Sequence, residues 1–261
     1  MKVDLVISHG RIDYLRTIAM GATPLIQVFH NPTQQSEIDA LLGMRKTGIR
    51  FIGVSRDQMN GMNPAELIDA VYNSVDLDRL VARPIAESPP YLVFLGRLTA
   101  NKGVHLAIEA ALITGIKLVI AGNVSDSEPG AREYFETRVR PHLGPKIEYI
   151  GVVDDVAKLK LLGGASALLF PIQWKEPFGI VMAEALACGC PVIGWRNGSV
   201  SEVIQHGKTG FIVDSVDEMV AAIKAISSID RASCRHDAET RFTQDSLVEG
   251  YLHSINKLIG K

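Results

Sequence analysis

Short apolar runs rich in β-formers alternate with longer amphipathic segments, which predicts an α/β fold built from parallel sheets. The clearest runs lie in the second half of the chain, each bounded by glycine or proline. We expect six strands there: 91–96, 117–122, 147–151, 167–171, 191–195 and 210–214. The helices expected around them are 102–114, 130–142, 154–163, 178–188, 199–206 and 216–228. Together these elements predict a complete Rossmann-like domain.

The start of the chain carries a weaker version of the same pattern. Its strands are expected at 3–8, 24–29, 50–55 and, less clearly, 70–74, with a helix at 33–45. In the doubly wound order 3-2-1-4-5-6 the last three strands form a contiguous half, so a sheet without its first half is a coherent piece. We therefore predict a partial Rossmann-like lobe over 1–82, a proline-bearing linker over 83–90 and the complete domain over 91–236. The segment 237–261 is expected to be a helix, amphipathic over 245–260, that returns toward the first lobe.

Composition changes this picture little. The 261 residues carry a formal net charge of −2, with 47% hydrophobic and 21% charged residues, so no nucleic-acid-binding footprint is expected. The apolar runs are far shorter than the roughly 18 residues of a membrane span, and the N-terminus does not resemble a signal peptide. We expect a cytoplasmic protein. Cys188, Cys190 and Cys234 are interpreted as reduced core residues rather than zinc ligands.

The segment "GRLTANKG" (96–103) is the first candidate for chemistry, because it follows a strand directly. Arg97 and Lys102 then lie at the carboxyl end of a parallel sheet, where such folds bind ligands. A planar guanidinium and a compact ammonium can together hold a diphosphate without a metal ion. The plainer alternative is that Lys102 is a solvated lysine at a helix start.

The segment "PIQWKEPFGIVMAEALACG" (171–189) is the second candidate. Glu184 lies in an otherwise apolar helix and needs a partner, and Glu176 lies just before the helix, where free backbone N–H groups favour an anion. Six residues of helix rise separate Phe178 from Glu184 by roughly 9 Å, which suits the two ends of one nucleotide sugar. Glu184 can bind the ribose and Glu176 the sugar, with the phosphates over Gly179 and Ile180. Alternatively, Glu184 only pairs with a basic residue of the core.

Four segments in order resemble glycosyltransferase family 4: "GRLTANKG", "EPFGIVMAE", "ALACGCPVIGWRNGSVSEVI" and "GKTGFIVD". The pair of glutamates separated by seven residues is the hallmark of this family. The resemblance covers 91–214 and continues more weakly upstream. It implies a GT-B fold, in which the first lobe is the acceptor side and the domain at 91–236 binds the nucleotide sugar.

The resemblance also implies roles for single residues. Arg97, Lys102 and Glu176 would be catalytic, together with His30, which would face the donor sugar from the first lobe. His30 could instead be a capping or core histidine. The substrate-binding residues expected from the helix start and the resemblance are Glu184, Phe178, Gly179, Ile180, Gly122, Asn123, Val152 and Val153, the last two through backbone contacts to the base.

No metal or cofactor is expected. Asp76 and Asp78 form an Asp-x-Asp sequence, but it belongs to the segment before the linker rather than to a GT-A metal site. Asp154 and Asp155 open a helix, where acidic residues are favoured by the helix dipole. The glycines of 122–133 lack the dinucleotide-binding fingerprint, so NAD is not predicted either.

The sequence thus predicts a retaining, metal-independent transferase that moves a hexose-like group from a UDP-, GDP- or ADP-sugar to an acceptor hydroxyl on a sugar, lipid or small molecule. Two alternatives stay open. The chain is a donor-binding module or truncated enzyme without transferase activity of its own, which the short first lobe favours, or it is a GT-B epimerase, which the fold alone allows. The strand at 3–8 is expected to be an exposed edge through which copies of the chain could associate.

Overall fold

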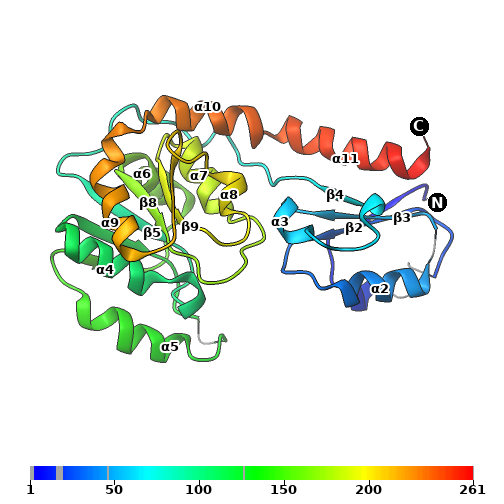
Figure 1. The fold of residues 1–261 in the computed structure, drawn as a ribbon, viewed down its shortest axis with the longest axis horizontal. Helices are drawn as coiled ribbons and strands as arrows, with labels where there is room; N and C mark the ends of the chain where they lie inside the picture. Colours follow the sequence, from blue (N-terminus) through cyan, green and yellow to red (C-terminus); the bar gives the residue numbers. More distant parts are fainter. Residues whose placement is uncertain (1–2, 16–19, 46, 126, 261) are drawn as a thin grey trace.

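A computed structural model describes residues 3–15, 20–45, 47–125 and 127–260. It contains two separate parallel sheets, one of four strands and one of six, joined by an extended segment (Figure 1). The prediction of an α/β fold with one complete and one partial parallel sheet is confirmed. Among the described residues, no helix has the length and apolar character needed to cross a membrane.

The bounds of the elements follow the expected order. The strands are β1 (Val6–Ser8), β2 (Leu25–Phe29), β3 (Ile49–Gly53), β4 (Ile68–Ala70), β5 (Tyr91–Leu95), β6 (Lys117–Ala121), β7 (Ile147–Tyr149), β8 (Ala167–Phe170), β9 (Val192–Trp195) and β10 (Gly210–Val213). The α-helices of the described residues are α2 (Gln35–Met44), α3 (Arg56–Met59), α4 (Val104–Thr114), α5 (Ala131–Tyr134), α6 (Asp155–Gly164), α7 (Ile180–Ala187), α8 (Val200–Val203), α9 (Val216–Ala225), α10 (Arg231–Arg241) and α11 (Gln244–Ile259).

The second sheet has the strand order β10-β9-β8-β5-β6-β7, which is the doubly wound order expected from the sequence. Successive residues of a strand point to opposite faces of the sheet, and helices bury both faces. Val93 and Leu168 pack with α7, α8 and α10 on one face. Leu92 and Leu169 pack with α4 and α9 on the other. The three cysteines are free and buried in the first of these cores, as expected for reduced core residues.

The first sheet has the order β1-β2-β3-β4, and β1 lies at its edge. One face packs against α2 through Leu25, Phe51 and Leu41. The opposite face, which includes Ile26 and Ile52, packs against apolar residues of α11. Figure 1 shows the sheet between α2 and the long C-terminal helix.

Four regions differ from the prediction, and the first is the helix expected at 199–206, which is only the short α8 (Val200–Val203). The start of helix α10 was not expected, because its segment "RASCRHDAETR" is mostly polar and buries few residues. The single helix expected at 237–261 is instead the end of α10 followed by the separate helix α11. The segment 130–142 is not one regular helix but a turn of α-helix, a π-helical stretch and a 3-10 turn. The weakest strand lies at 68–70 instead of 70–74, since β4 pairs with β3 through Ile68 to Ala70 and the chain leaves the sheet afterwards.

Candidate functional site

The cavity between the strand ends and α7

The carboxyl ends of β5 and β8 and the start of α7 surround a cavity of about 340 Å³. The topology explains the meeting, because neighbouring parallel strands end at the same edge of a sheet. The cavity is lined by Phe94, Leu95, Gly96, Arg97, Lys102, Lys158, Phe170, Glu176, Gly179, Ile180, Val181 and Glu184. Six residues singled out in the sequence, Arg97, Lys102, Glu176, Gly179, Ile180 and Glu184, therefore share one site.

Each expected cation of this cavity has a carboxylate partner. Arg97 is about half exposed, and its Nη1 lies 2.7 Å from Oε2 of Glu128. Lys102 is largely buried, and its Nζ lies 2.5 Å from Oε2 of Glu176. The indole N–H of Trp174 donates to the same oxygen at 2.7 Å. The Glu176 carboxylate is therefore held in place from two sides, and Lys102 is an ion-paired residue of the cavity rather than a solvated lysine.

Gly179 is the N-cap of helix α7, and its φ of 70° lies in the left-handed region that favours glycine. A Cβ at this position would lie 2.8 Å from the methyl of Met182 and 3.3 Å from Cγ of Glu176. Glycine thus lets the chain turn sharply from Glu176 into the helix. Gly179 and Ile180 line the cavity at the start of α7, and the first N–H groups of a helix are a suitable setting for phosphate oxygens.

Glu184 pairs with Lys158, a residue that the sequence did not single out. Nζ of Lys158 lies 2.6 Å from Oε1 of Glu184 and 3.3 Å from Oδ1 of Asp155. Burial alone would lower the pKa of Lys158, but the Glu184 and Asp155 carboxylates raise it, so the ammonium stays charged. The pair also borders a second cavity of about 210 Å³ that reaches Asp76 and Arg79.

The partner required by Glu184 was expected, but its identity was not. Lys158 lies on α6, 26 residues before Glu184 in the chain. No motif in this helix distinguishes Lys158 from an ordinary surface lysine. A search for lysines and arginines facing the carboxyl edge from every expected helix would have found it.

The remaining expected donor residues lie elsewhere around this edge. The ring of Phe178 is buried in the core, 5.9 Å from the ring of Tyr72 and 5.7 Å from that of Phe242. The Phe178 ring does not line the cavity, so a contact with substrate there would use its backbone. Phe178 was predicted as a substrate-binding residue; its core packing follows from the apolar pattern that it shares with α7.

Gly122 and Asn123 lie beside the loop that carries Arg97. A Cβ on Gly122 would lie 1.7 Å from the carbonyl oxygen of Gly96, so only glycine allows this approach. The carbonyl of Asn123 accepts a hydrogen bond from the N–H of Leu98 at 3.0 Å. These two residues support the loop. Val152, a largely exposed side chain, and Val153 follow β7 and are absent from the cavity lining.

The histidine cluster of the first sheet

His30 follows β2 and faces His9, which follows β1. Nδ1 of His9 lies 2.8 Å from Nε2 of His30, and the rings stack with centroids 5.1 Å apart. Burial and the neighbouring His9 lower the pKa of His30. Both histidines line a cavity of about 530 Å³ with Arg11 and Gln27. His30 is thus not a core residue, and its partner was missed because His9 lies 21 residues earlier.

The buried side chain of Gln27 is anchored by its amide nitrogen, which donates to the carbonyls of Gly10 and Val28. Its Oε1 has no partner among the described residues.

Asp76, one of the two acids dismissed as a metal site, pairs with Arg79 at 3.4 Å. Within the described part of the chain, no group of three or more histidine, cysteine, aspartate or glutamate residues is arranged to hold a metal ion.

Comparison with known proteins

The model of the family described as glycosyl transferases group 1 matches residues 80–241. Among curated relatives, N-acetyl-alpha-D-glucosaminyl L-malate synthase of Bacillus anthracis is 30% identical over 178 residues, which cover 63% of this chain and 45% of the relative. The D-inositol 3-phosphate glycosyltransferase of Mycobacterium tuberculosis is 26% identical over 226 residues, which cover 78% of this chain and 46% of the relative. The chain thus matches less than half the length of these relatives.

Solved structures agree with the fold over nearly all of the chain. The Anabaena protein HepE in complex with UDP-glucose is 19% identical with a TM-score of 0.79, and the match covers 99% of this chain and 79% of HepE. AviGT4, a glycosyltransferase involved in avilamycin A biosynthesis, is 25% identical with a TM-score of 0.76, over 100% of this chain and 76% of that one. The expected GT-B fold is confirmed, and the chain belongs to the group 1 glycosyl transferases.

Proposed function

We propose that this chain transfers a hexose-like group from a nucleoside diphosphate sugar to an acceptor hydroxyl, with retention at the anomeric carbon and without a metal ion. The observation that supports the proposal is the single cavity in which Arg97, Lys102, Glu176, Glu184 and the start of α7 converge. Cations, helix N–H groups and two separate carboxylates match the diphosphate, sugar and ribose of one donor.

In this proposal the donor diphosphate exchanges partners with the acids of the cavity. Its oxygens take the place of Glu128 beside Arg97 and share Lys102 with Glu176. As the bond between the anomeric carbon and the phosphate oxygen breaks, the charge on the departing diphosphate grows. Arg97, Lys102 and the N–H groups of α7 therefore stabilise the transition state more strongly than the ground state, in which this charge is smaller. The leaving phosphate oxygen accepts the proton of the acceptor hydroxyl, and the acceptor oxygen attacks from the same face.

The two glutamates have different tasks in the proposal. Glu176, fixed by Lys102 and Trp174, accepts hydrogen bonds from the sugar hydroxyls and orients the ring. Glu184, fixed by Lys158, accepts from the ribose hydroxyls. His30 reaches the donor sugar from the first sheet, and Gly122, Asn123, Val152 and Val153 lie on the nucleotide side.

Substitution of the two cations tests the proposal. We expect Arg97→Ala and Lys102→Ala each to lower kcat by roughly 100-fold or more, as removal of a charge-stabilising donor does in other enzymes. Matched controls are Arg140→Ala and Lys117→Ala, which remove cations paired with Glu136 and Glu148 on the surface. Near-normal turnover in either cavity variant, with both controls unchanged, would remove the assigned role.

The nucleotide is identified first by thermal shift with UDP, GDP and ADP, and sugars of the stabilising nucleotide are then tried as donors. UDP is the first to test, because HepE is described in complex with UDP and UDP-glucose. Retention is read from the anomeric coupling constant of the product by NMR, and metal independence from turnover in EDTA. An inverted product or loss of activity in EDTA contradicts the corresponding part of the proposal.

A second candidate is a donor-binding module without transferase activity of its own. The first sheet, which has four strands against six in the second, favours it. Such a module would associate through β1, the edge strand, where Ile7 is 37% exposed. Under this hypothesis Ile7→Lys converts an oligomer to a monomer in light scattering. A monomeric wild type with full transfer activity supports the first candidate instead.

A further inference from the structure

We propose that Glu202 is a positioning residue that holds the first sheet and the loop carrying Glu176 in one arrangement. We call the hydrogen bonds between the Glu202 carboxylate and the first part of the chain the clasp. The clasp is given by the structure, whereas its consequence for sugar transfer rests on the proposed function. Glu202 lies on the short helix α8, and none of the expected site residues is on this helix.

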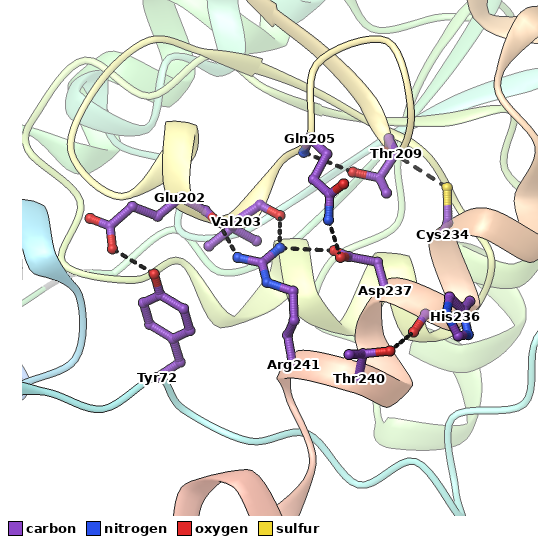
Figure 2. Close-up of polar contacts among 10 residues, drawn as sticks. All are labelled: Tyr72, Glu202, Val203, Gln205, Thr209, Cys234, His236, Asp237, Thr240 and Arg241. Atoms are coloured by element: carbon purple, nitrogen blue, oxygen red, sulfur yellow. Dashed lines mark hydrogen bonds and ion pairs between the residues drawn. The ribbon is translucent and has the colours of Figure 1, made fainter. Parts of the chain in front are cut away.

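The Glu202 carboxylate binds three donors from the first part of the chain. The backbone N–H of Arg56 donates to Oε2 at 2.9 Å, and that of Asp57 donates to Oε1 at 2.6 Å. The Tyr72 hydroxyl donates to Oε2 at 2.9 Å, and Figure 2 shows this contact. Burial and Glu202 raise the pKa of Tyr72, so the hydroxyl keeps its proton and remains a donor. Hydrogen bonds to a carboxylate are stronger than those between neutral groups.

The backbone of α8 is fixed from the other side by α10. Arg241 donates to the carbonyls of Glu202 and Val203, and its Nη1 lies 2.9 Å from Oδ2 of the buried Asp237. The amide of Gln205 donates to the other oxygen of Asp237, so this carboxylate is bound twice (Figure 2). The Arg241 guanidinium also lies over the ring of Tyr72, 5.7 Å from its centroid. Glu202 therefore reaches the first sheet from a rigid base.

The segment just before α8 contacts the loop of the cavity. A Cβ on Gly198 would lie 2.4 Å from the backbone N and O of Glu176, so glycine permits direct backbone packing there. The N–H of Ser199 donates to the carbonyl of Glu176 at 3.0 Å, and its hydroxyl donates to that of Phe178 at 2.8 Å. The Phe178 ring packs against Tyr72, the tyrosine that binds Glu202.

Residues 198–202 thus contact the Glu176 loop at one end. At the other end they contact the start of α3, just after β3, and Tyr72, just after β4. Arg56 and Asp57 follow β3, so they stand at the carboxyl edge of the first sheet, the edge that also carries His9 and His30. Fixing this edge against the Glu176 loop fixes the distance across which acceptor and donor must meet. Displacements of about 1 Å between reacting groups can cost on the order of 100-fold in rate.

The test compares Glu202→Ala, Glu202→Gln and Tyr72→Phe with Glu218→Ala as the matched control. Glu218 also accepts a hydrogen bond from a backbone N–H, that of Asp214 at 2.8 Å, but within the second domain. Hydrogen exchange of the Arg56 and Asp57 amides reads the clasp directly. Small-angle scattering reads the separation of the lobes, and kcat and UDP affinity separate positioning from donor binding.

We expect Glu202→Ala to expose the two amides, to increase the radius of gyration, and to lower kcat about tenfold or more with UDP affinity within about threefold. Glu202→Gln and Tyr72→Phe should give smaller changes of the same kind, because each keeps part of the contact. Amides that stay protected in Glu202→Ala overturn the clasp, and unchanged kcat after their exposure overturns the positioning role. If the wild type transfers no sugar, the proposed function fails, while exchange and scattering still decide the clasp.

Discussion

The two sheets of this molecule are completed in different ways. The six-stranded sheet is covered on both faces by helices that lie between or soon after its own strands. The four-stranded sheet is covered on one face by α2, which lies between its strands, and on the other by α11, at the far end of the chain (Figure 1). The core of the six-stranded sheet is therefore completed by helices near its own strands in the sequence, whereas one face of the first sheet is covered by a helix distant in the sequence.

Because of this difference, we expect the first sheet to be less stable than the second. The packing of α11 involves Leu247, Tyr251, Ile255 and Leu258 against Ile26, Val28, Ile52 and Val71. Without that contact the first sheet would expose a continuous apolar face to water, which costs about 25 cal/mol per Å². Local unfolding should therefore begin in the first sheet and leave the cavity between β5, β8 and α7 intact.

Removal of α11 is expected to have the largest effect. A chain that ends at Thr243 should lose amide protection throughout β2 and β3, while β5 and β8 stay protected and UDP binding persists within about threefold. Hydrogen exchange by mass spectrometry measures both regions in one sample. Equal loss of protection in the two sheets would break the comparison, since it would mean that the second sheet also depends on this helix.

The next effect in size is expected at Asp69, which links α11 to β4. Its carboxylate pairs with the buried Arg50 at 3.0 Å and accepts from Lys257 at 2.7 Å and Ser254 at 2.8 Å. Asp69→Ala leaves the Arg50 guanidinium buried without its partner and should lower the free energy of unfolding of the first sheet by about 3 kcal/mol. Glu136→Ala, which breaks a pair of exposed side chains with Arg140, is the control and should change stability by less than about 1 kcal/mol.

The Asp69 contacts also have a pH signature. Burial alone would raise the pKa of Asp69, but Lys257, Ser254 and Arg50 together lower it. A carboxyl whose pKa is lower in the folded state stabilises the fold above its unfolded pKa, and this stabilisation is lost as the pH falls below about 4. Denaturant titrations between pH 6 and about 3 should show a smaller decline in Asp69→Ala than in the wild type. Parallel declines in both proteins would contradict the assignment.

The sequence predicted the elements best where both faces of a strand are buried. Strands such as β5 and β8 then appear as short continuous apolar runs between glycines and prolines, which is the pattern of a strand buried on both faces. The start of helix α10 was missed because its contacts are polar. Arg231 donates to the carbonyl of Gly163 near the end of α6, and Arg235 donates to that of Ala187 at the end of α7, so the segment has no apolar stripe to recognise.

The same division applies to the site. Site residues that lie within one short segment were predictable, because Glu176, Gly179 and Glu184 all lie near the start of α7. Their partners were not, since ion pairs form between elements that are distant in the chain. The ion pair of Lys158 with Glu184 is of this kind, and the hydrogen bonds of His9 with His30 and of Glu202 with the Arg56 backbone N–H likewise join distant segments. Pattern alone does not give the relative positions of such elements.

The smallest expected effect concerns two helical glycines on opposite faces of the first sheet. A Cβ on Gly250 of α11 would lie 2.7 Å from Cγ1 of Val71, whereas one on Gly43 of α2 would meet nothing within 4 Å. Alanine is favoured over glycine inside a helix by about 1 kcal/mol. Gly43→Ala should therefore raise the free energy of unfolding by up to about that amount.

At Gly250 the steric term opposes this gain. Val71 is β-branched and its side chain has little rotamer freedom, so the helix itself must move away from β4, at a cost of about 1–3 kcal/mol. We expect Gly250→Ala to lower the free energy of unfolding by up to about 2 kcal/mol, measured by urea denaturation beside Gly43→Ala. Stabilisation of similar size in both variants would mean that α11 can shift away from Val71 at no cost. The close contact of Gly250 with Val71 would then not be needed for the packing of α11 on the first sheet.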